Sequence, residues 1–201
     1  IDLLTDSGTS AMSQYQWAGL MTGDESYAGC RNWFHLEETI KDITGYKFVV
    51  PTHQGRPAEN ILTLIHVQPG LSAVSNMFFD TTHANVENKG GIARNFVIEA
   101  GLDSEADHPF KGNLDPARLE EFIERESRDQ VSLILVTLTC NNNGGQPVSI
   151  ANLRQVREVA DKYQLPFYLD AARFAENAYF IQQREPGYQD KSIKQIAREM
   201  F

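Results

Sequence analysis

The sequence of 201 residues lacks an excess of basic side chains, long apolar runs and a framework of cysteines. Its 18 Lys and Arg against 27 Asp and Glu give a formal net charge of −9. This balance argues against a protein that coats nucleic acid, because phosphate contacts need clustered cations. The longest uncharged apolar runs, such as residues 131–138, are far shorter than the about 20 apolar residues of a membrane-spanning helix. We therefore predict neither a nucleic-acid partner nor a membrane partner.

Two cysteines, Cys30 and Cys140, lie too far apart for a compact metal knuckle and form no disulfide framework. This usage predicts a reducing compartment, the cytoplasm. The five histidines show no metal-ligand spacing, and we expect His35 and His66 to be structural. Ile1 is not an initiator Met and no signal peptide follows it, so we expect the chain to begin inside a longer sequence.

Alternating strand and helix patterns predict an α/β fold with a mostly parallel sheet. The first thirty residues are polar and rich in turn formers. Strands are expected over residues 47–50, 72–75, 95–98, 131–139 and 166–170. Helices are expected over residues 31–44, from 56, over 83–88, 115–127, 149–163 and 172–183, and after a cap at 192. In such folds ligands bind beyond the carboxyl ends of the strands.

The loop after the expected strand at 47–50 could hold a phosphate. Gly55 permits close approach of the backbone, the following helix offers N–H groups, and Arg56 adds a positive charge. An ordinary tight turn with a solvated arginine explains the same residues, and the loop is shorter than a P-loop. The spacing alone leaves both interpretations open.

Two further strand ends carry polar groups. Residues 140–147, CNNNGGQP, could donate side-chain amides to a ligand oxygen, or form a turn that needs left-handed residues. Asp170 ends a buried strand, where a carboxylate needs a cation or a donor. The protonated pyridinium of pyridoxal 5′-phosphate (PLP) is one such partner, and capping of the next helix is the alternative. Phe79 and Asp80 could face a flat ligand, or fill core and cap a helix.

Five segments resemble those of the aromatic amino-acid β-eliminating lyases, the PLP-dependent family of tryptophanase and tyrosine phenol-lyase. They are IDLLTDSGT at 1–9, GDESYAG at 23–29, PTHQGR at 51–56, NNNGGQPVS at 141–149 and ARFAENAYFI at 172–181. The resemblance implies an α/β fold, part of the large PLP-binding domain of the fold-type I enzymes, with helices on both faces of the sheet. It divides the chain into residues 1–30, with substrate, cation and intersubunit motifs, and residues 31–201, an incomplete PLP-binding domain.

The resemblance also implies how the cofactor is bound. The residues that match PLP-binding positions are Gln54, Gly55 and Arg56 at the phosphate, Phe79 stacked on the ring, Asn141 and Arg173 at the phenolic oxygen, and Asp170 at the ring nitrogen. Asp170 would keep that nitrogen protonated, so that the ring serves as an electron sink.

Other matching positions imply catalytic, substrate and cation roles. Tyr27 matches a tyrosine that protonates the leaving aromatic carbon across a subunit interface, and acts with Asp170 and Arg173. Thr5 matches a residue near the substrate carboxylate. Gly8 and Glu25 match ligands of an activating monovalent cation, usually K⁺. The implied assembly is a homotetramer whose active sites are shared between subunits.

The implied reaction is β-elimination from an aromatic L-amino acid, which releases pyruvate and ammonium. Asp80, within FFDTT, resembles the tryptophanase branch, where the tyrosine branch usually has Thr. The short segment 62–77 is closer in length to the tyrosine enzymes. Asp80 and the stretch after Ala172 lead us to predict L-tryptophan as substrate and indole as product, with tyrosine phenol-lyase as the alternative.

Three features depart from the family. Pro57 replaces a frequent Gly, and Ala171 and Ala172 precede Arg173 where relatives often carry a hydroxyl. The sequence also ends before the segment that bears the Schiff-base lysine, so we expect the 201 residues alone to be inactive. Three interpretations follow: part of a full-length lyase, a truncated non-catalytic fragment, or a phosphate-binding module without chemistry. The retained polar site residues favour the first.

Overall fold

The computed structural model describes residues 12–23 and 29–201, which belong to two compact units, Ile1–Val49 and Val50–Phe201. In the first unit, α1 (Gln14–Met21) and α2 (Arg31–Thr44) are helical. The expectation of turns throughout the first thirty residues is wrong for α1. Ser13 and Gln16 form a capping box there, in which each side chain accepts a hydrogen bond from the other residue's backbone N–H. The bounds of α2 are the predicted ones, and Gly45 ends it at φ +80°.

The second unit is built on a four-stranded, all-parallel sheet in the order β2-β1-β3-β4. The strands are β1 (Ser72–Ser75), β2 (Ile92–Asn95), β3 (Val131–Thr137) and β4 (Phe167–Asp170). All seven residues of β3 are buried, as the apolar pattern on both faces predicted. The predicted α/β fold with a parallel sheet is confirmed.

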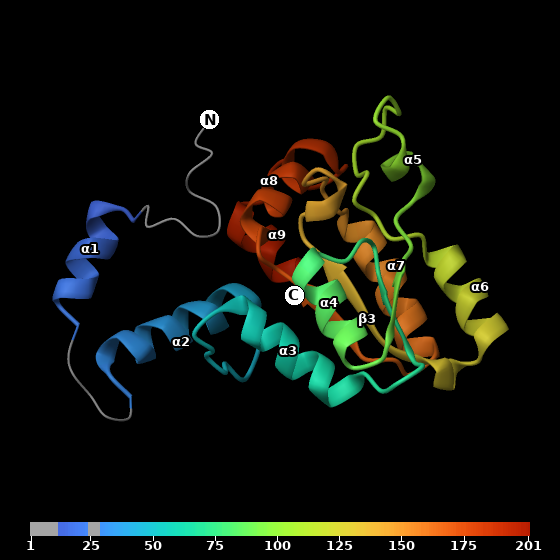
Figure 1. Ribbon diagram of the computed structural model, residues 1–201. Coiled ribbons are helices and arrows are strands. Elements are labelled where there is room, and N and C mark those ends of the chain that lie inside the picture. Colours follow the sequence, from blue (N-terminus) through green and yellow to red (C-terminus); the bar gives the residue numbers. More distant parts are fainter. Residues whose placement is uncertain (1–11, 24–28) are drawn as a thin grey trace. The chain divides into compact units, whose positions relative to one another are not determined.

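Helices flank this sheet, and in Figure 1 β3 has α4 on one side and α7 on the other. They are α3 (Gly55–His66), α4 (Asp80–Asn88), α5 (Glu99–Leu102), α6 (Pro116–Glu126), α7 (Ile150–Lys162), α8 (Phe174–Arg184) and α9 (Ile193–Met200), with short 3₁₀ turns at η1 (Arg128–Gln130) and η2 (Asn141–Asn143). In the part of the chain that the structure describes, no helix is both long and apolar enough to cross a membrane.

Two predicted strands differ from the structure. Residues 47–50 form no strand and pair with none of β1 to β4; Phe48 and Val50 there are 75% and 84% exposed. The strand expected at 95–98 lies at Ile92–Asn95 instead. Gly91 explains that shift, because its backbone packs so closely on Val67 that the chain joins the sheet directly after α4. A Cβ at Gly91 would lie 2.4 Å from the Val67 side chain.

The strand register identifies which side chains share a face of the sheet. Leu135 pairs with Tyr168, and Thr137 pairs with Asp170, in the parallel β3–β4 ladder. Partners in register project to the same face, as do alternate residues along a strand. Leu135 and Tyr168 pack in one apolar cluster with Val86 of α4. Thr137 and Asp170 therefore continue the face that α3 and α4 cover, at its carboxyl edge.

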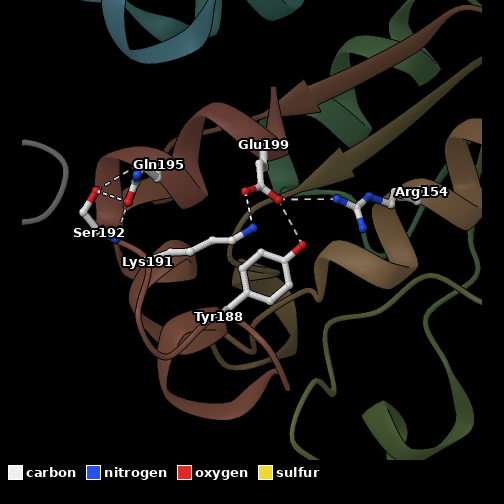
Figure 2. Close-up of polar contacts among 6 residues, drawn as sticks. All are labelled: Arg154, Tyr188, Lys191, Ser192, Gln195 and Glu199. Atoms are coloured by element: carbon white, nitrogen blue, oxygen red, sulfur yellow. Dashed lines mark hydrogen bonds and ion pairs between the residues drawn. The ribbon is translucent and has the colours of Figure 1, made fainter.

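The last helix, α9, is fixed by polar contacts as well as by its apolar face. Figure 2 shows three side chains converging on the carboxylate of Glu199: Lys191 at 2.5 Å, Tyr188 at 3.1 Å and Arg154 of α7 at 3.4 Å. Burial, with the hydrogen bond to Glu199, raises the pKa of Tyr188. The predicted cap Ser192 begins the helix, and its Oγ accepts from the N–H of Gln195.

A histidine–tyrosine pair joins α3 to β4. His66 Nε2 and the Tyr168 hydroxyl are 2.6 Å apart, a hydrogen bond that a neutral imidazole can accept from the hydroxyl. Burial lowers the pKa of His66. The unfolded chain therefore binds a proton more readily than the folded protein, and stability rises with pH through the region below about 6.5.

We expect the free energy of unfolding to be lower at pH 5.5 than at pH 7.5, and His66→Gln to reduce that difference. Glutamine cannot titrate but retains an acceptor for the Tyr168 hydroxyl. Urea unfolding at the two pH values measures the effect, with His35→Gln, on the exposed surface of α2, as the matched control. An unchanged pH dependence in His66→Gln would contradict the assignment.

Candidate active site

The predicted site residues of the second unit follow strands that end at one edge of the sheet. Phe79 comes after β1, Asn141 after β3, and Arg173 after β4, while Asp170 is the last residue of β4. Because all four strands are parallel, their carboxyl ends meet at the same edge. The topology thus gathers side chains that lie up to about a hundred residues apart in sequence.

Asp170 is the half-buried last residue of β4, and the expectation of a buried strand here is wrong, because all four residues of β4 are half-buried. The Asp170 Oδ1 accepts a hydrogen bond of 3.2 Å from the N–H of Ala172. The surrounding backbone is also fixed: the N–H of Leu138 donates to the Asp170 carbonyl at 2.8 Å, and the N–H of Arg173 donates to the Leu138 carbonyl at 2.9 Å. Burial raises the pKa of Asp170, partly offset by the Ala172 N–H and the positive charge of Arg173.

The helix-capping alternative for Asp170 does not describe the local geometry. Helix α8 begins at Phe174, and its N-cap is Arg173 rather than Asp170. The carboxylate accepts from a residue two positions on, which is an Asx turn before the helix. The half-buried carboxylate therefore has a position that helix capping does not explain.

The loop that precedes α3 offers backbone donors. Gln54 is the N-cap, and its side chain makes no capping hydrogen bond within the described chain. A Cβ built on Gly55 would meet no described atom within 4 Å, and Arg56 is exposed. An uncapped helix N-terminus with open space beside a cation is suited to an anion.

Contacts between α3 and α4 place this loop on the same side of the sheet as Asp170. The two helices pack together, and the Thr81 hydroxyl, at the start of α4, donates to Glu59 at 2.9 Å. Glu59 lies in the first half of α3. The first turns of both helices are therefore adjacent, near the carboxyl end of β1.

Phe79 and Asp80 begin α4 and differ in environment. Phe79 is the N-cap and is half-buried. Asp80 is exposed, and its Oδ1 accepts a hydrogen bond of 2.6 Å from the N–H of Thr81. Asn142, in the turn that bears Asn141, donates to the Phe78 carbonyl at 2.6 Å. This hydrogen bond brings the turn after β3 beside the loop after β1.

Buried asparagines that sequence reasoning missed hold these loops. Asn76 accepts from the N–H of Thr137 at 3.0 Å and donates to the carbonyls of Gly112 and Thr137. Asn177 of α8 binds both the N–H and the carbonyl of Val148 at 2.9 Å. Nothing in a single sequence separates such bracing amides from asparagines in ordinary surface turns.

Two hydroxyls near the site, those of Thr137 and Thr82, are buried and have no hydrogen-bond partner among the described residues. Thr137 is the register partner of Asp170 and shares its face of the sheet. Buried polar atoms without partners are uncommon in native proteins. The Cys140 thiol next to this turn is also buried, which raises its pKa to about 12 and argues against a nucleophilic role.

The remaining predictions lie outside the described residues. Thr5 and Gly8 fall within residues 1–11, and Glu25 and Tyr27 within 24–28. Their substrate, cation and proton-transfer roles therefore stay predictions, as does the functional boundary at residue 30. Within the described ranges, 12–23 and 29–201, no group of three His, Cys, Asp or Glu side chains is arranged so that it could hold a metal ion.

Comparison with known proteins supports the resemblance over the whole chain. A tryptophanase from Salinibacter ruber is 56% identical over all 201 residues, which span 42% of that protein. A tyrosine phenol-lyase from Symbiobacterium sp. is 52% identical, and the chain spans 44% of it. The chain thus covers less than half the length of these relatives.

Solved structures show the same fold. Cystalysin from Treponema denticola, whose crystal structure contains pyridoxal 5′-phosphate, matches with a TM-score of 0.56 at 14% identity, over 76% of this chain and 38% of that chain. This likeness confirms the predicted fold class, that of the fold-type I PLP enzymes. Residues 2–201 also match the family described as "Beta-eliminating lyase". The chain therefore belongs to the beta-eliminating lyase family.

Proposed function

We propose that the protein carrying this chain is a PLP-dependent carbon–carbon lyase that converts L-tryptophan to indole, pyruvate and ammonium. Family membership over residues 2–201 supports the reaction class. The observation that carries the proposal is the half-buried Asp170 carboxylate at the carboxyl edge of a parallel sheet, whose position helix capping does not explain. Desolvation raises the pKa of this carboxyl despite the Ala172 N–H and the charge of Arg173, and a cationic ligand beside it would relieve that cost.

The described residues fit PLP. The uncapped N-terminus of α3, with Gln54, open space at Gly55 and the charge of Arg56, suits a phosphate. The unpartnered hydroxyl of Thr137, in register with Asp170, supports a polar ligand on this face. The residues that would hold PLP are Gln54, Gly55 and Arg56 at the phosphate, Phe79 at the ring, Asn141 and Arg173 at the phenolic oxygen, and Asp170 at the nitrogen.

When bound, PLP supplies an electron sink for the carbanion that forms at Cα of the substrate. Asp170 would hold a proton on the ring nitrogen, because an ion pair with a pyridinium relieves the burial of its charge. Arg173 would keep its positive charge beside the phenolic oxygen. Tyr27 would donate a proton to the ring carbon of the leaving group, which makes indole a leaving group. Thr5 would bind near the substrate carboxylate.

The assembly and the cation belong to the same proposal. Gly8 and Glu25 would ligate an activating monovalent cation, K⁺. The active site would be shared between subunits of a homotetramer, located in the cytoplasm. The composition supports this location through its two cysteines.

A specific observation favours a second substrate. The chain is 52% identical to a tyrosine phenol-lyase, close to its identity with a tryptophanase. The short segment 62–77 also suits the tyrosine branch. L-tyrosine, with phenol as product, is therefore the alternative.

Two measurements test the proposal. The denatured intact mass should exceed twice 22.6 kDa, the mass of this chain, because the lysine-bearing half must be present. Elimination assays with PLP and K⁺ should then release pyruvate and indole from tryptophan faster than pyruvate and phenol from tyrosine. A mass near 22.6 kDa, or no pyruvate from either amino acid, would contradict the proposed activity. The similarity to lyases would then reflect common ancestry alone.

Asp80→Thr tests the substrate assignment. We expect this variant to lower kcat/KM for tryptophan by about tenfold more than for S-methylcysteine, because a lost polar contact to substrate is worth about 1–2 kcal/mol. The S-alkylcysteine lacks the aromatic ring and serves as the internal control. Equal losses on both substrates would remove the specificity role of Asp80.

A further inference from the structure

We propose that Asn142 is a positioning residue for the cofactor-stacking ring of Phe79. It fixes the peptide that presents this ring and links that peptide to the turn carrying Asn141. This inference rests on the proposed function, in which Phe79 and Asn141 both contact PLP. Asn142 itself would touch neither cofactor nor substrate.

Phe78, whose carbonyl belongs to the peptide that precedes Phe79, is held at three points. The Phe78 side chain is 1% exposed and packs in the apolar cluster between the sheet and α3 and α4. Its N–H donates to Asn95 Oδ1 at 2.9 Å, and its carbonyl accepts from Asn142 Nδ2 at 2.6 Å. The two asparagines come from opposite neighbours in the sheet order, since β2 and β3 both pair with β1.

The carbonyl that Asn142 binds belongs to the peptide bond joined to the nitrogen of Phe79. A hydrogen bond at this oxygen resists rotation of the peptide plane, and that rotation would swing the Phe79 Cα and its ring. Phe79 has φ −66° and ψ 154°, an extended N-cap conformation from which α4 begins. Its carbonyl accepts from the N–H of His83 at 2.9 Å, inside the helix, and the hydrogen bond at the Phe78 carbonyl fixes the peptide on its other side.

The other end of the link is a rigid turn. Residues 141–143 form the 3₁₀ turn η2, closed by Gly145, whose N–H donates to the carbonyls of Cys140 and Asn141. Asn143 Nδ2 donates to the Lys111 carbonyl at 2.9 Å on a different loop. The hydrogen bond of Asn142 therefore ties the peptide before Phe79 to a turn that is itself held in place. The neighbouring Asn143 carries the same amide but binds a different partner, so it serves as a matched control.

Asn142 is exposed overall, so its replacement should leave the fold intact. We expect Asn142→Ala to weaken PLP binding to the complete protein by about fivefold, as loss of one hydrogen bond predicts. The visible circular dichroism of bound PLP should also lose intensity, because the ring environment becomes less fixed. Asn142→Asp should weaken binding further, since a carboxylate oxygen would oppose the Phe78 carbonyl. Asn143→Ala is the control and should bind PLP within about twofold of the parent.

A double-mutant cycle separates positioning from general stability. If Asn142 acts through the Phe79 ring, Asn142→Ala should have no further effect on PLP affinity in a Phe79→Leu background. Additive losses, or equal losses in Asn142→Ala and Asn143→Ala, would overturn the inference. A parent protein that does not bind PLP would overturn the proposed function itself, and the role of Asn142 with it. Thermal unfolding of each variant verifies folding, and Asn142→Ser provides a smaller polar replacement.

Discussion

Asp170→Asn is expected to lower kcat/KM for elimination by about a thousandfold or more, which corresponds to about 4 kcal/mol of transition-state stabilisation. The amide has no charge, so it cannot hold a proton on the ring nitrogen of bound PLP. The cofactor would then be a weaker electron sink for the Cα carbanion. Pyruvate release from tryptophan measures the loss, with saturating PLP to separate chemistry from binding.

The same substitution should stabilise the protein when PLP is absent. Burial raises the pKa of Asp170 above its value in the unfolded chain, which is about 4. The folded state therefore binds more protons than the unfolded state between the two values, and the free energy of unfolding falls as pH rises through that window. Asparagine removes this penalty, so the apo variant should have a higher Tm than the apo parent at pH 7.

Asp161→Asn, on the exposed side of α7, is the matched control for charge. It should leave elimination within about twofold of the parent, because surface substitutions of this kind have small effects. Retention of a tenth or more of the parent activity by Asp170→Asn would contradict the electron-sink role. A lower apo Tm in Asp170→Asn would contradict the burial penalty.

Elements whose ends are set by local chemistry could be predicted from the sequence. Helix α2 has its expected bounds because Gly45 adopts φ +80°, and α9 starts after Ser192 because its hydroxyl caps Gln195. Helix α1 was missed, since Trp17, Leu20 and Met21 are all exposed and follow no buried stripe.

Tertiary contacts decided the features that local patterns could not predict. Strand β2 begins at Ile92 because Gly91 packs against Val67, a residue from the connection after α3. The apolar residues 96–98 include Val97, which is buried and forms an isolated bridge with Leu114 outside the sheet. The apolar sequence pattern predicts that these residues are buried, but it does not predict which element of the structure covers them.

The sequence predicted the site residues in separate loops. The order of the strands in the sheet explains why these loops are adjacent. The spacing around Gly55 was also consistent with an ordinary tight turn, and the position of Asp170 was also consistent with a helix cap. Resemblance to the family identified these residues, whereas the structure explains why Asp170 has no capping role. Asn76 and Asn142 were missed as supports because their partners lie 36 to 64 residues away.

Glu185 is another polar side chain that braces the second unit, and its loss is expected to cause the largest change in stability. It follows α8 and is 7% exposed. Its two carboxylate oxygens accept from the N–H groups of Ile150 at 2.8 Å and Ala151 at 2.9 Å, at the N-terminus of α7. A carboxylate there satisfies two helix donors and interacts favourably with the helix dipole.

Glu185→Gln should lower the free energy of unfolding by about 3 kcal/mol, because the side-chain NH₂ group would face a buried backbone donor and leave it unpaired. Urea unfolding at pH 7 measures this change. Glu158→Gln, on the exposed face of α7, is the matched control and should change stability by less than about 0.5 kcal/mol. Equal values for the two variants would mean that Glu185 does not anchor α7. Since α7 follows the turn that bears Asn141, its release should also weaken PLP binding, which links the stability of this helix to the proposed site.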